Sequence, residues 1–154
     1  MKTHSGKKGV GMPVVRNPQF YFKEGFCWND VNTIYLKCRV KGKSINDVKS
    51  MSMYTLTNIV PKNCIISLIN STFISEYVNN FVNNTQTFQI NDARQIPIII
   101  PSKNQLEGFK VIFENAYRIK KDQFANNIAE EKANKLLVSL QKNLDGLVKE
   151  LYSV

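Results

Sequence analysis

An apolar run held between two prolines constrains the fold of this chain more than any other feature. The segment Thr85–Ser102 reads T-Q-T-F-Q-I-N-D-A-R-Q-I-P-I-I-I-P-S. Its β-branched isoleucines favour a buried strand, and Pro97 and Pro101 cannot donate to a sheet ladder, so they fix the ends of that strand or place it at an edge. Ser102 then suits the N-cap of a following helix. The segment predicts a junction between a mixed sheet and a helix, with a polar platform before the strand.

Short extended runs lie upstream of this junction. Aromatic and β-branched residues in 14–40 and 51–57 alternate with turn signals, and Glu24-Gly25 predicts a tight hairpin. In T-I-Y-L-K-C-R-V and the lysine after it, alternation predicts an apolar face of Ile34, Leu36, Cys38 and Val40. The opposite face would carry Tyr35, Lys37, Arg39 and Lys41. This second face suits a phosphate backbone, but it also suits an ordinary solvated sheet face.

Helical patterns occupy the middle and the end of the chain. Residues 61–84 predict two consecutive buried helices separated near Asn70-Ser71, and 103–154 is helical throughout. Within the last part, apolar residues step by four and three, as in a heptad seam. The seam consists of Ala133, Leu137, Leu140, Leu144, Leu147 and Leu151. It must be buried against the earlier helix folded back, against a second copy in a homodimer, or against a different subunit.

These patterns together predict an α/β chain of the α+β type. We expect a mixed, twisted β-sheet with packed helices over residues 1–102, followed over residues 103–154 by a long C-terminal helix or helical hairpin that acts as a spacer or docking segment. No run approaches the roughly 18 to 20 apolar residues of a membrane helix, and the basic N-terminus is followed by no apolar signal core. A cytoplasmic location without membrane association is therefore expected.

The net charge of +9 is concentrated in the first third of the chain. Residues 1–50 carry ten Lys and Arg against three Asp and Glu, whereas residues 51–102 are balanced at two against two and residues 103–154 carry nine against seven. A one-sided excess of this kind indicates a polyanionic partner. Solubility alone is an equally good explanation of the charge when it is taken by itself.

The residues that most enzymes require are missing from the pattern. A methyltransferase needs a glycine-rich loop for its methyl donor and an N/D-P-P-Y/F tetrapeptide, and neither is present. The five acidic residues of the first 102 include no nuclease cluster for Mg²⁺, and the single histidine, His4, has no partner for nucleophilic catalysis. Cys27, Cys38 and Cys64 are too widely spaced for a zinc site and indicate buried apolar positions. No catalysis, metal or cofactor is expected of this chain alone.

Three segments carry a resemblance to a known family. I-N-D-A-R-Q-I-P-I-I-I-P-S, F-Y-F-K-E-G-F-C-W-N-D and S-L-I-N-S-T-F-I-S-E-Y resemble the target recognition domain of bacterial restriction–modification adenine methyltransferases, over about Gly11 to Gln105. The similarity is to type IIG enzymes and phage-exclusion methyltransferases, whose recognition domain is related to type I specificity subunits. It implies a non-catalytic chain that reads double-stranded DNA for a methyltransferase or endonuclease domain. S-adenosylmethionine would belong to that absent domain, and a fragment is favoured over a free-standing specificity chain.

The resemblance divides the expected DNA contacts into two groups. Phosphate contacts are expected of six cations: Arg16, Lys37, Arg39, Lys41, Lys43 and Lys49. Base reading is expected of forked side chains beside the isoleucine run, chiefly Gln89 and Arg94, with Gln86 and Asn91 as further candidates. For Asn91, Asp92 and Arg94 a structural role in a turn is favoured, so the basic loops are the better candidates for specificity.

Two other functions fit the same residues. In a helical protein-interaction or subunit-docking module, the heptad seam would be the active surface and the chain would have no DNA binding of its own. In an RNA-binding module, Phe20, Tyr21, Phe22, Tyr35 and Tyr54 would stack on bases. A preference for duplex DNA with a steep salt dependence distinguishes the recognition domain from both.

Overall fold

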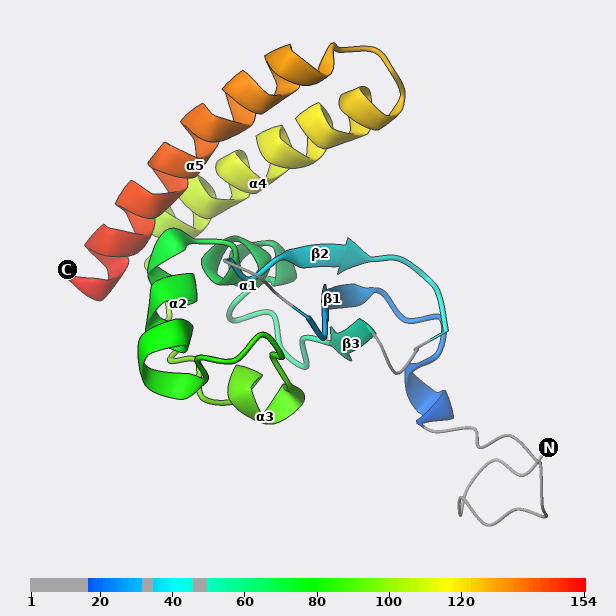
Figure 1. Cartoon of the computed structure of the whole chain (residues 1–154), viewed down its shortest axis with the longest axis vertical. Helices are drawn as coiled ribbons and strands as arrows, with labels where there is room; N and C mark the ends of the chain where they lie inside the picture. Colours follow the sequence, from blue (N-terminus) through cyan, green and yellow to red (C-terminus); the bar gives the residue numbers. More distant parts are fainter. Residues whose placement is uncertain (1–16, 32–34, 46–49) are drawn as a thin grey trace.

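The computed structural model describes residues 17–31, 35–45 and 50–154. Figure 1 shows a small sheet on one side, a helical hairpin on the other, and helix α1 between them. The elements in chain order are the 3₁₀ helix η1 (Pro18–Phe20), β1 (Gly25–Asn29), β2 (Cys38–Lys41), β3 (Ser50–Met53), α1 (Lys62–Ile69), α2 (Thr72–Tyr77), the π-helix η2 (Val78–Val82), α3 (Ile90–Ala93), α4 (Lys103–Phe124) and α5 (Glu130–Tyr152). The predicted α+β class and the C-terminal helical hairpin are both confirmed.

The three described strands form one antiparallel sheet in the order β2-β1-β3. The prediction of a mixed sheet is therefore wrong for the described residues. In this register Trp28 pairs with Cys38 and with Met51, which places all three on the face toward α1 and α2. The predicted hairpin at Glu24-Gly25 is also wrong, because Gly25 begins β1 and the segment before it contains the 3₁₀ helix η1 (Pro18–Phe20) in place of a pairing strand.

The isoleucine run is extended chain and not a strand. Residues 97–100 have no regular secondary structure, and only Ile96 is buried while Ile98, Ile99 and Ile100 are exposed. Two prolines within five residues remove the donors that a sheet ladder needs. The Pro97 carbonyl instead accepts a hydrogen bond from the Tyr152 hydroxyl, which attaches this segment to the end of α5.

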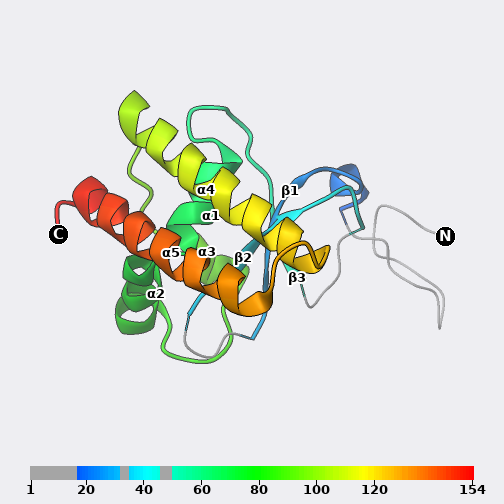
Figure 2. The ribbon, with the colours of Figure 1, turned by 90° about the horizontal axis from the view of Figure 1, so that it is seen from above.

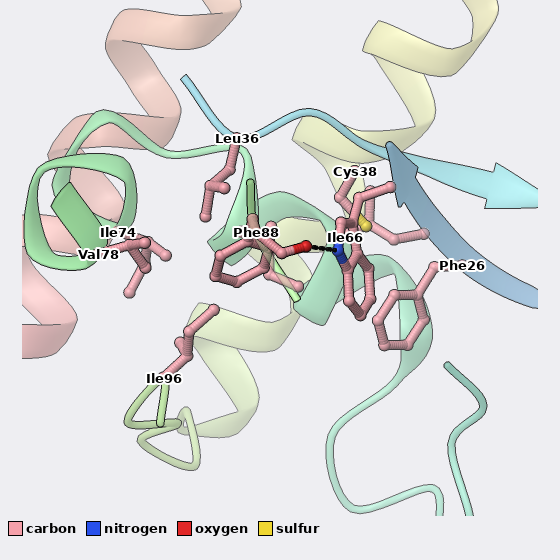
Figure 3. Packing of buried hydrophobic residues seen from close by; sticks show 10 residues of the cluster. Phe26, Leu36, Cys38, Ile66, Ile74, Val78, Phe88 and Ile96 are labelled. Carbon is pink, nitrogen blue, oxygen red and sulfur yellow. Dashed lines mark hydrogen bonds between the residues drawn. The ribbon is translucent and has the colours of Figure 1, made fainter. Parts of the chain in front are cut away.

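Helix α1 is apolar on nearly all sides because it packs against the sheet on one side and against the helical hairpin on the other. Ile66 and Ile69 contact the sheet-side core, where Phe26, Trp28, Ile74 and Phe88 are buried. Figure 3 shows this cluster. Cys64 and Leu68 belong to a second core with Phe109, Leu144, Val148 and Leu151 of the hairpin. The predicted pair of buried helices is confirmed, with Ser71 as the N-cap of α2.

The hairpin is defined by its caps and its turn. Ser102 is the N-cap of α4, as predicted, and Gln105 completes a capping box with it. At its end Asn126 adopts a left-handed conformation (φ 58°), which asparagine tolerates, and the chain reverses into α5. Figure 2 shows α4 and α5 lying side by side. Asp145 of α5 also accepts hydrogen bonds from the backbone and hydroxyl of Thr72, at 2.8 and 2.9 Å, and so docks the hairpin on α2.

The heptad seam is buried largely within the chain itself. Ala133, Leu144 and Leu151 are buried while Leu137, Leu140 and Leu147 are half-buried, and α5 packs antiparallel on α4. Of the three partners expected, the earlier helix folded back is the one present. The boundary predicted between residues 102 and 103 stays a prediction, and the hairpin shares a core with α1 across it. No helix of the described part of the chain is long and apolar enough to span a bilayer.

The three cysteines are free thiols in different environments, which gives a first testable result. Burial raises the pKa of the Cys38 and Cys64 thiols to about 12, so almost no reactive thiolate exists at neutral pH. Cys27 is half-buried. In the native protein we expect an aromatic disulfide reagent to modify Cys27 alone, and to modify all three after denaturation in urea. Fast modification of two or more native thiols would contradict this burial.

Candidate nucleic-acid interface

The cationic strand splits into an exposed part and a buried part. Lys37 and Arg39 are exposed, as is Lys43 just beyond the strand. The predicted alternation holds from Tyr35 to Arg39, since Leu36 and Cys38 are buried between them. Lys37 and Arg39 lie two residues apart, about 7 Å in an extended chain. These three side chains form what we call the β2 cationic strip.

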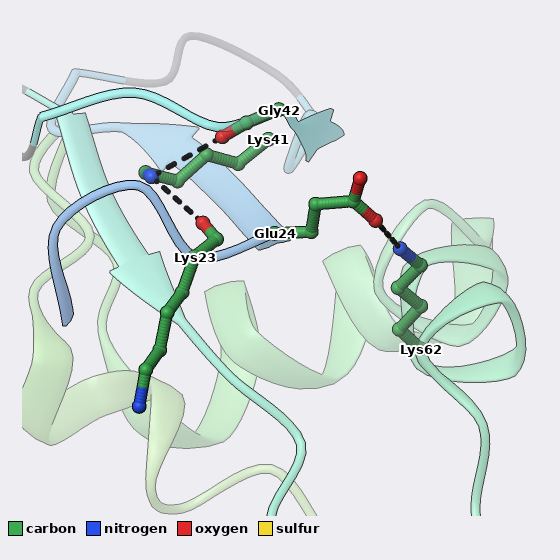
Figure 4. Close-up of polar contacts among 5 residues, drawn as sticks. All are labelled: Lys23, Glu24, Lys41, Gly42 and Lys62. Atoms are coloured by element: carbon green, nitrogen blue, oxygen red, sulfur yellow. Dashed lines mark hydrogen bonds and ion pairs between the residues drawn. The ribbon is translucent and has the colours of Figure 1, made fainter.

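Lys41 does not belong to this strip, so its predicted phosphate contact is wrong. Only 6% of Lys41 is exposed. Its Nζ donates to the carbonyl oxygens of Lys23, Gly42 and Ser44 at 3.2, 3.4 and 3.0 Å, and two of these contacts are drawn in Figure 4. Its charge is thus satisfied inside the protein.

The burial of Lys41 has a cross-strand cause. Lys41 pairs with Gly25, and beyond Gly25 lies Tyr54, whose ring centroid is 5.6 Å from Lys41 Nζ. A Cβ at Gly25 would come within 2.3 Å of the Met53 carbonyl oxygen, so only glycine fits there. The Tyr54 ring also stacks on Phe20, and its hydroxyl donates to the Phe20 carbonyl. The 17–24 segment thereby covers this end of the sheet.

The covering segment brings further side chains to the surface near Lys43. Lys23 is exposed, with its Nζ 5.5 Å from the centre of the Phe20 ring, and Phe22 is exposed in a left-handed conformation (φ 58°). The Phe22 amide donates to the Ser44 carbonyl. The sequence did not indicate Lys23 as a candidate phosphate contact. Its segment reads as a strand, and only the contacts of Tyr54 with Phe20 and Lys41 show that this segment lies over the end of the sheet. Beside it, Lys62 lowers the pKa of the exposed Glu24 through a 3.0 Å hydrogen bond and its charge (Figure 4).

The polar platform is attached to the end of β1. Trp28 Nε1 donates to the Phe88 carbonyl at 3.0 Å, and the Phe88 amide donates to the Asp30 carbonyl. Val31 forms a bridge with Thr87. The Gln89 side chain is exposed, and its Nε2 donates to the Asp30 carboxylate at 2.7 Å.

The predicted structural role of the polar residues of α3 in a turn agrees with their contacts. Asp92 accepts from the Gln89 amide at 2.8 Å and from Asn83 Nδ2 at 2.9 Å, so it caps α3 and fixes the loop before it. Arg94 is exposed and donates to Asn91 Oδ1 at 3.1 Å. In Figure 1 helix α3 lies on the opposite side of the sheet region from β2. Arg94 is the C-cap of α3, and its side chain contacts Asn91 of the same helix.

Tyr35 lies where the platform meets the strip. It is 51% exposed and lines a small polar pocket of about 150 Å³ together with Asn79, Asn83 and residues 84–88. Gln86 lies in the wall of this pocket. An exposed aromatic ring beside amide and hydroxyl groups can stack on a base and hydrogen-bond its edge. Tyr35 is two residues from Lys37, so this pocket adjoins the first cation of the strip.

Two of the predicted phosphate contacts, Arg16 and Lys49, lie outside the described residues. Within the ranges that the structure covers, no group of three or more His, Cys, Asp or Glu side chains is placed to hold a metal ion. The chain matches none of the protein-family models and none of the curated proteins with which it was compared.

Proposed function

We propose that this chain binds double-stranded DNA without catalysing a reaction, and that it supplies target recognition to a restriction–modification adenine methyltransferase. The observation that carries the proposal is the exposure of three cations along β2: Lys37 just before the strand, Arg39 within it and Lys43 in the following loop. Phosphate neutralisation by such a strip releases counterions, which supplies affinity without regard to sequence. The resemblance to recognition domains supplies the biological context.

The division of labour follows from where the side chains are held. The strip sets the register of the duplex, and Tyr35, Gln86 and Gln89 lie on the adjoining platform, where base edges can be read. The hydrogen bonds that attach the platform to β1 keep these groups in place relative to the strip. S-adenosylmethionine and the reacting groups would be held by a separate cytoplasmic catalytic domain or subunit.

Binding to a random-sequence duplex at several salt concentrations tests this proposal. Each phosphate contact contributes about 0.9 to the slope of log K against log salt. For Lys37→Ala/Arg39→Ala/Lys43→Ala we expect about 10- to 100-fold weaker binding at low salt and a slope reduced by about 2.7. Fluorescence anisotropy measures both quantities, and a single-stranded competitor of the same length tests the preference for duplex.

Two controls separate the effect of net charge from the effect of where the charge lies. The triple variant Lys132→Ala/Lys142→Ala/Lys149→Ala removes the same charge from exposed positions on α5, and Lys41→Met removes the buried cation of β2. Both should leave the salt slope unchanged. Equal losses in the two triple variants would mean that only net charge matters, and the recognition proposal would then be abandoned. A preference for single strands would favour the RNA-binding alternative.

A further inference from the structure

A large groove separates β2 from the outer half of the helical hairpin. It has a volume of about 860 Å³ and lies between residues 35–40 on one side and two helices on the other. Figure 1 shows the hairpin diverging from β2 toward its tip. From α4 the groove is lined by Ile112, Phe113, Ala116, Tyr117, Lys120 and Phe124, and from α5 by Leu137, Leu140, Gln141 and Leu144. The DNA proposal uses Tyr35, Lys37 and Arg39 at one wall of this groove but none of its helical lining.

The groove is apolar over a length that suits a helix. The α4 residues lining it recur at helical spacing from Ile112 to Phe124, which is about 18 Å at 1.5 Å per residue. Tyr117 and Phe124 are exposed, and Leu137 and Leu140 of the heptad seam are only half-buried. The seam therefore has a part that α4 does not cover. Apolar grooves of this kind receive the apolar face of an amphipathic helix.

The edge of β2 is closed to an added strand. The Cys38 amide donates to Asn70 Oδ1 at 2.9 Å, and the Cys38 carbonyl accepts from Asn70 Nδ2 at 2.8 Å. The Leu36 amide donates to the Ser75 hydroxyl at 3.1 Å. An incoming strand would need these same backbone groups for its ladder. A helical occupant needs none of them.

The charge around the groove selects among helices. Among the described residues that line it are three cations, Lys37, Arg39 and Lys120, and no carboxylate. Lys37 and Arg39 come from the sheet side and Lys120 from α4, so positive charge borders the apolar floor on both sides. A helix with acidic residues flanking its apolar face is complementary to this arrangement, whereas a basic flank is repelled.

We propose that this groove docks an amphipathic helix of a partner protein, apolar on one face and acidic along both flanks. Its leucine-like side chains fill the space between Phe113, Tyr117 and Leu137, and its carboxylates meet Lys37, Arg39 and Lys120. The proposal does not rest on DNA binding, although two of these cations serve both surfaces.

The probe is a pair of synthetic helices of about 16 residues, long enough to exceed the groove. Both carry leucines at i, i+3, i+4, i+7 and i+11 and are held helical by a side-chain staple. One has glutamates on both flanks and the other has lysines. We expect the glutamate peptide to bind the full chain at least tenfold more tightly than the lysine peptide in about 150 mM salt, as measured by fluorescence anisotropy.

Adjacent positions on α5 supply a matched pair of variants. Leu137 lines the groove, whereas Val138 is 58% exposed and does not. Leu137→Asp should weaken binding of the glutamate peptide about tenfold or more, and Val138→Asp should leave it unchanged. Lys120→Glu should weaken the glutamate peptide and strengthen the lysine peptide. Circular dichroism confirms that each variant is folded.

The two proposals fail in different ways in these experiments. Leu137→Asp should retain DNA binding, and Lys43→Ala, which lies outside the groove, should retain peptide binding. Equal affinity for the two peptides, or equal effects of Leu137→Asp and Val138→Asp, overturns the docking proposal and leaves DNA binding to its own test. Concentration-dependent dimerisation that Leu137→Asp abolishes would also overturn it, since a second copy would then occupy the groove.

Discussion

Trp28→Ala is expected to destabilise the chain by about 3–5 kcal/mol, the usual cost of truncating a large buried aromatic residue. Trp28 is 1% exposed and contacts Phe88, whose ring centroid lies 5.7 Å away. Its Nε1 also holds the Phe88 carbonyl at 3.0 Å. The substitution removes a core side chain and releases the polar platform from β1. Urea denaturation followed by circular dichroism measures the loss of stability. Tryptophan fluorescence cannot be used, because Trp28 is the only tryptophan.

Two further variants separate volume from hydrogen bonding. Trp28→Phe keeps most of the apolar contact but leaves the Phe88 carbonyl without its donor, so we expect a smaller loss of about 1–3 kcal/mol. Phe124→Ala is the control, because Phe124 is 83% exposed and should lose less than about 0.5 kcal/mol. A loss for Trp28→Ala no larger than that of Phe124→Ala would mean that the sheet-side core is not packed as described.

Local patterns were sufficient for the helices because their signals lie close together in the chain. Ser102 and Gln105 define one start, Ser71 another, and the apolar spacing of 133–151 gives the face of α5 that packs on α4. The same spacing could not identify the partner of the seam. That choice depends on the turn at Asn126 and on the Asp145 contact with Thr72, which join residues far apart in sequence.

The strands were less predictable, because whether a segment forms a strand, and which of its faces is buried, depends on the segments that pack beside it. The four isoleucines and two prolines of residues 96–101 read as a strand, but they form no ladder, and the Pro97 carbonyl accepts a hydrogen bond from Tyr152. Alternation placed Lys41 on the solvent face of β2, and the register agrees with that face. It could not show that Tyr54 and residues 17–24 cover that end. Lys37 and Arg39 are exposed as the alternation predicts, and their phosphate contacts stay a prediction, whereas Lys41 is buried.

The side chain of Asn70 makes two hydrogen bonds to β2 that its sequence context does not predict. It follows α1 and reads as a simple helix end, yet its amide pairs with both backbone groups of Cys38. Each hydrogen bond of this kind contributes about 0.5–1.5 kcal/mol, and an unpaired buried group costs more. Asn70 thus fastens α1 to the sheet edge and also prevents that edge from pairing with another chain.

Asn70→Ala should therefore cost about 2–3 kcal/mol in urea denaturation and promote association through β2, seen as larger species in sedimentation at high concentration. Asn80→Ala, at an exposed amide of η2, is the matched control and should change neither property.

Asn70→Asp adds a pH test. Its carboxylate would face the Cys38 carbonyl, which raises its folded pKa above the unfolded value of about 3.9. A raised pKa gives stability that is fully present below that unfolded value and lost as the pH rises through the folded one. The Asp variant should thus approach the native protein near pH 4 and fall behind it at pH 7, whereas a deficit independent of pH would show that the amide nitrogen does not face that carbonyl.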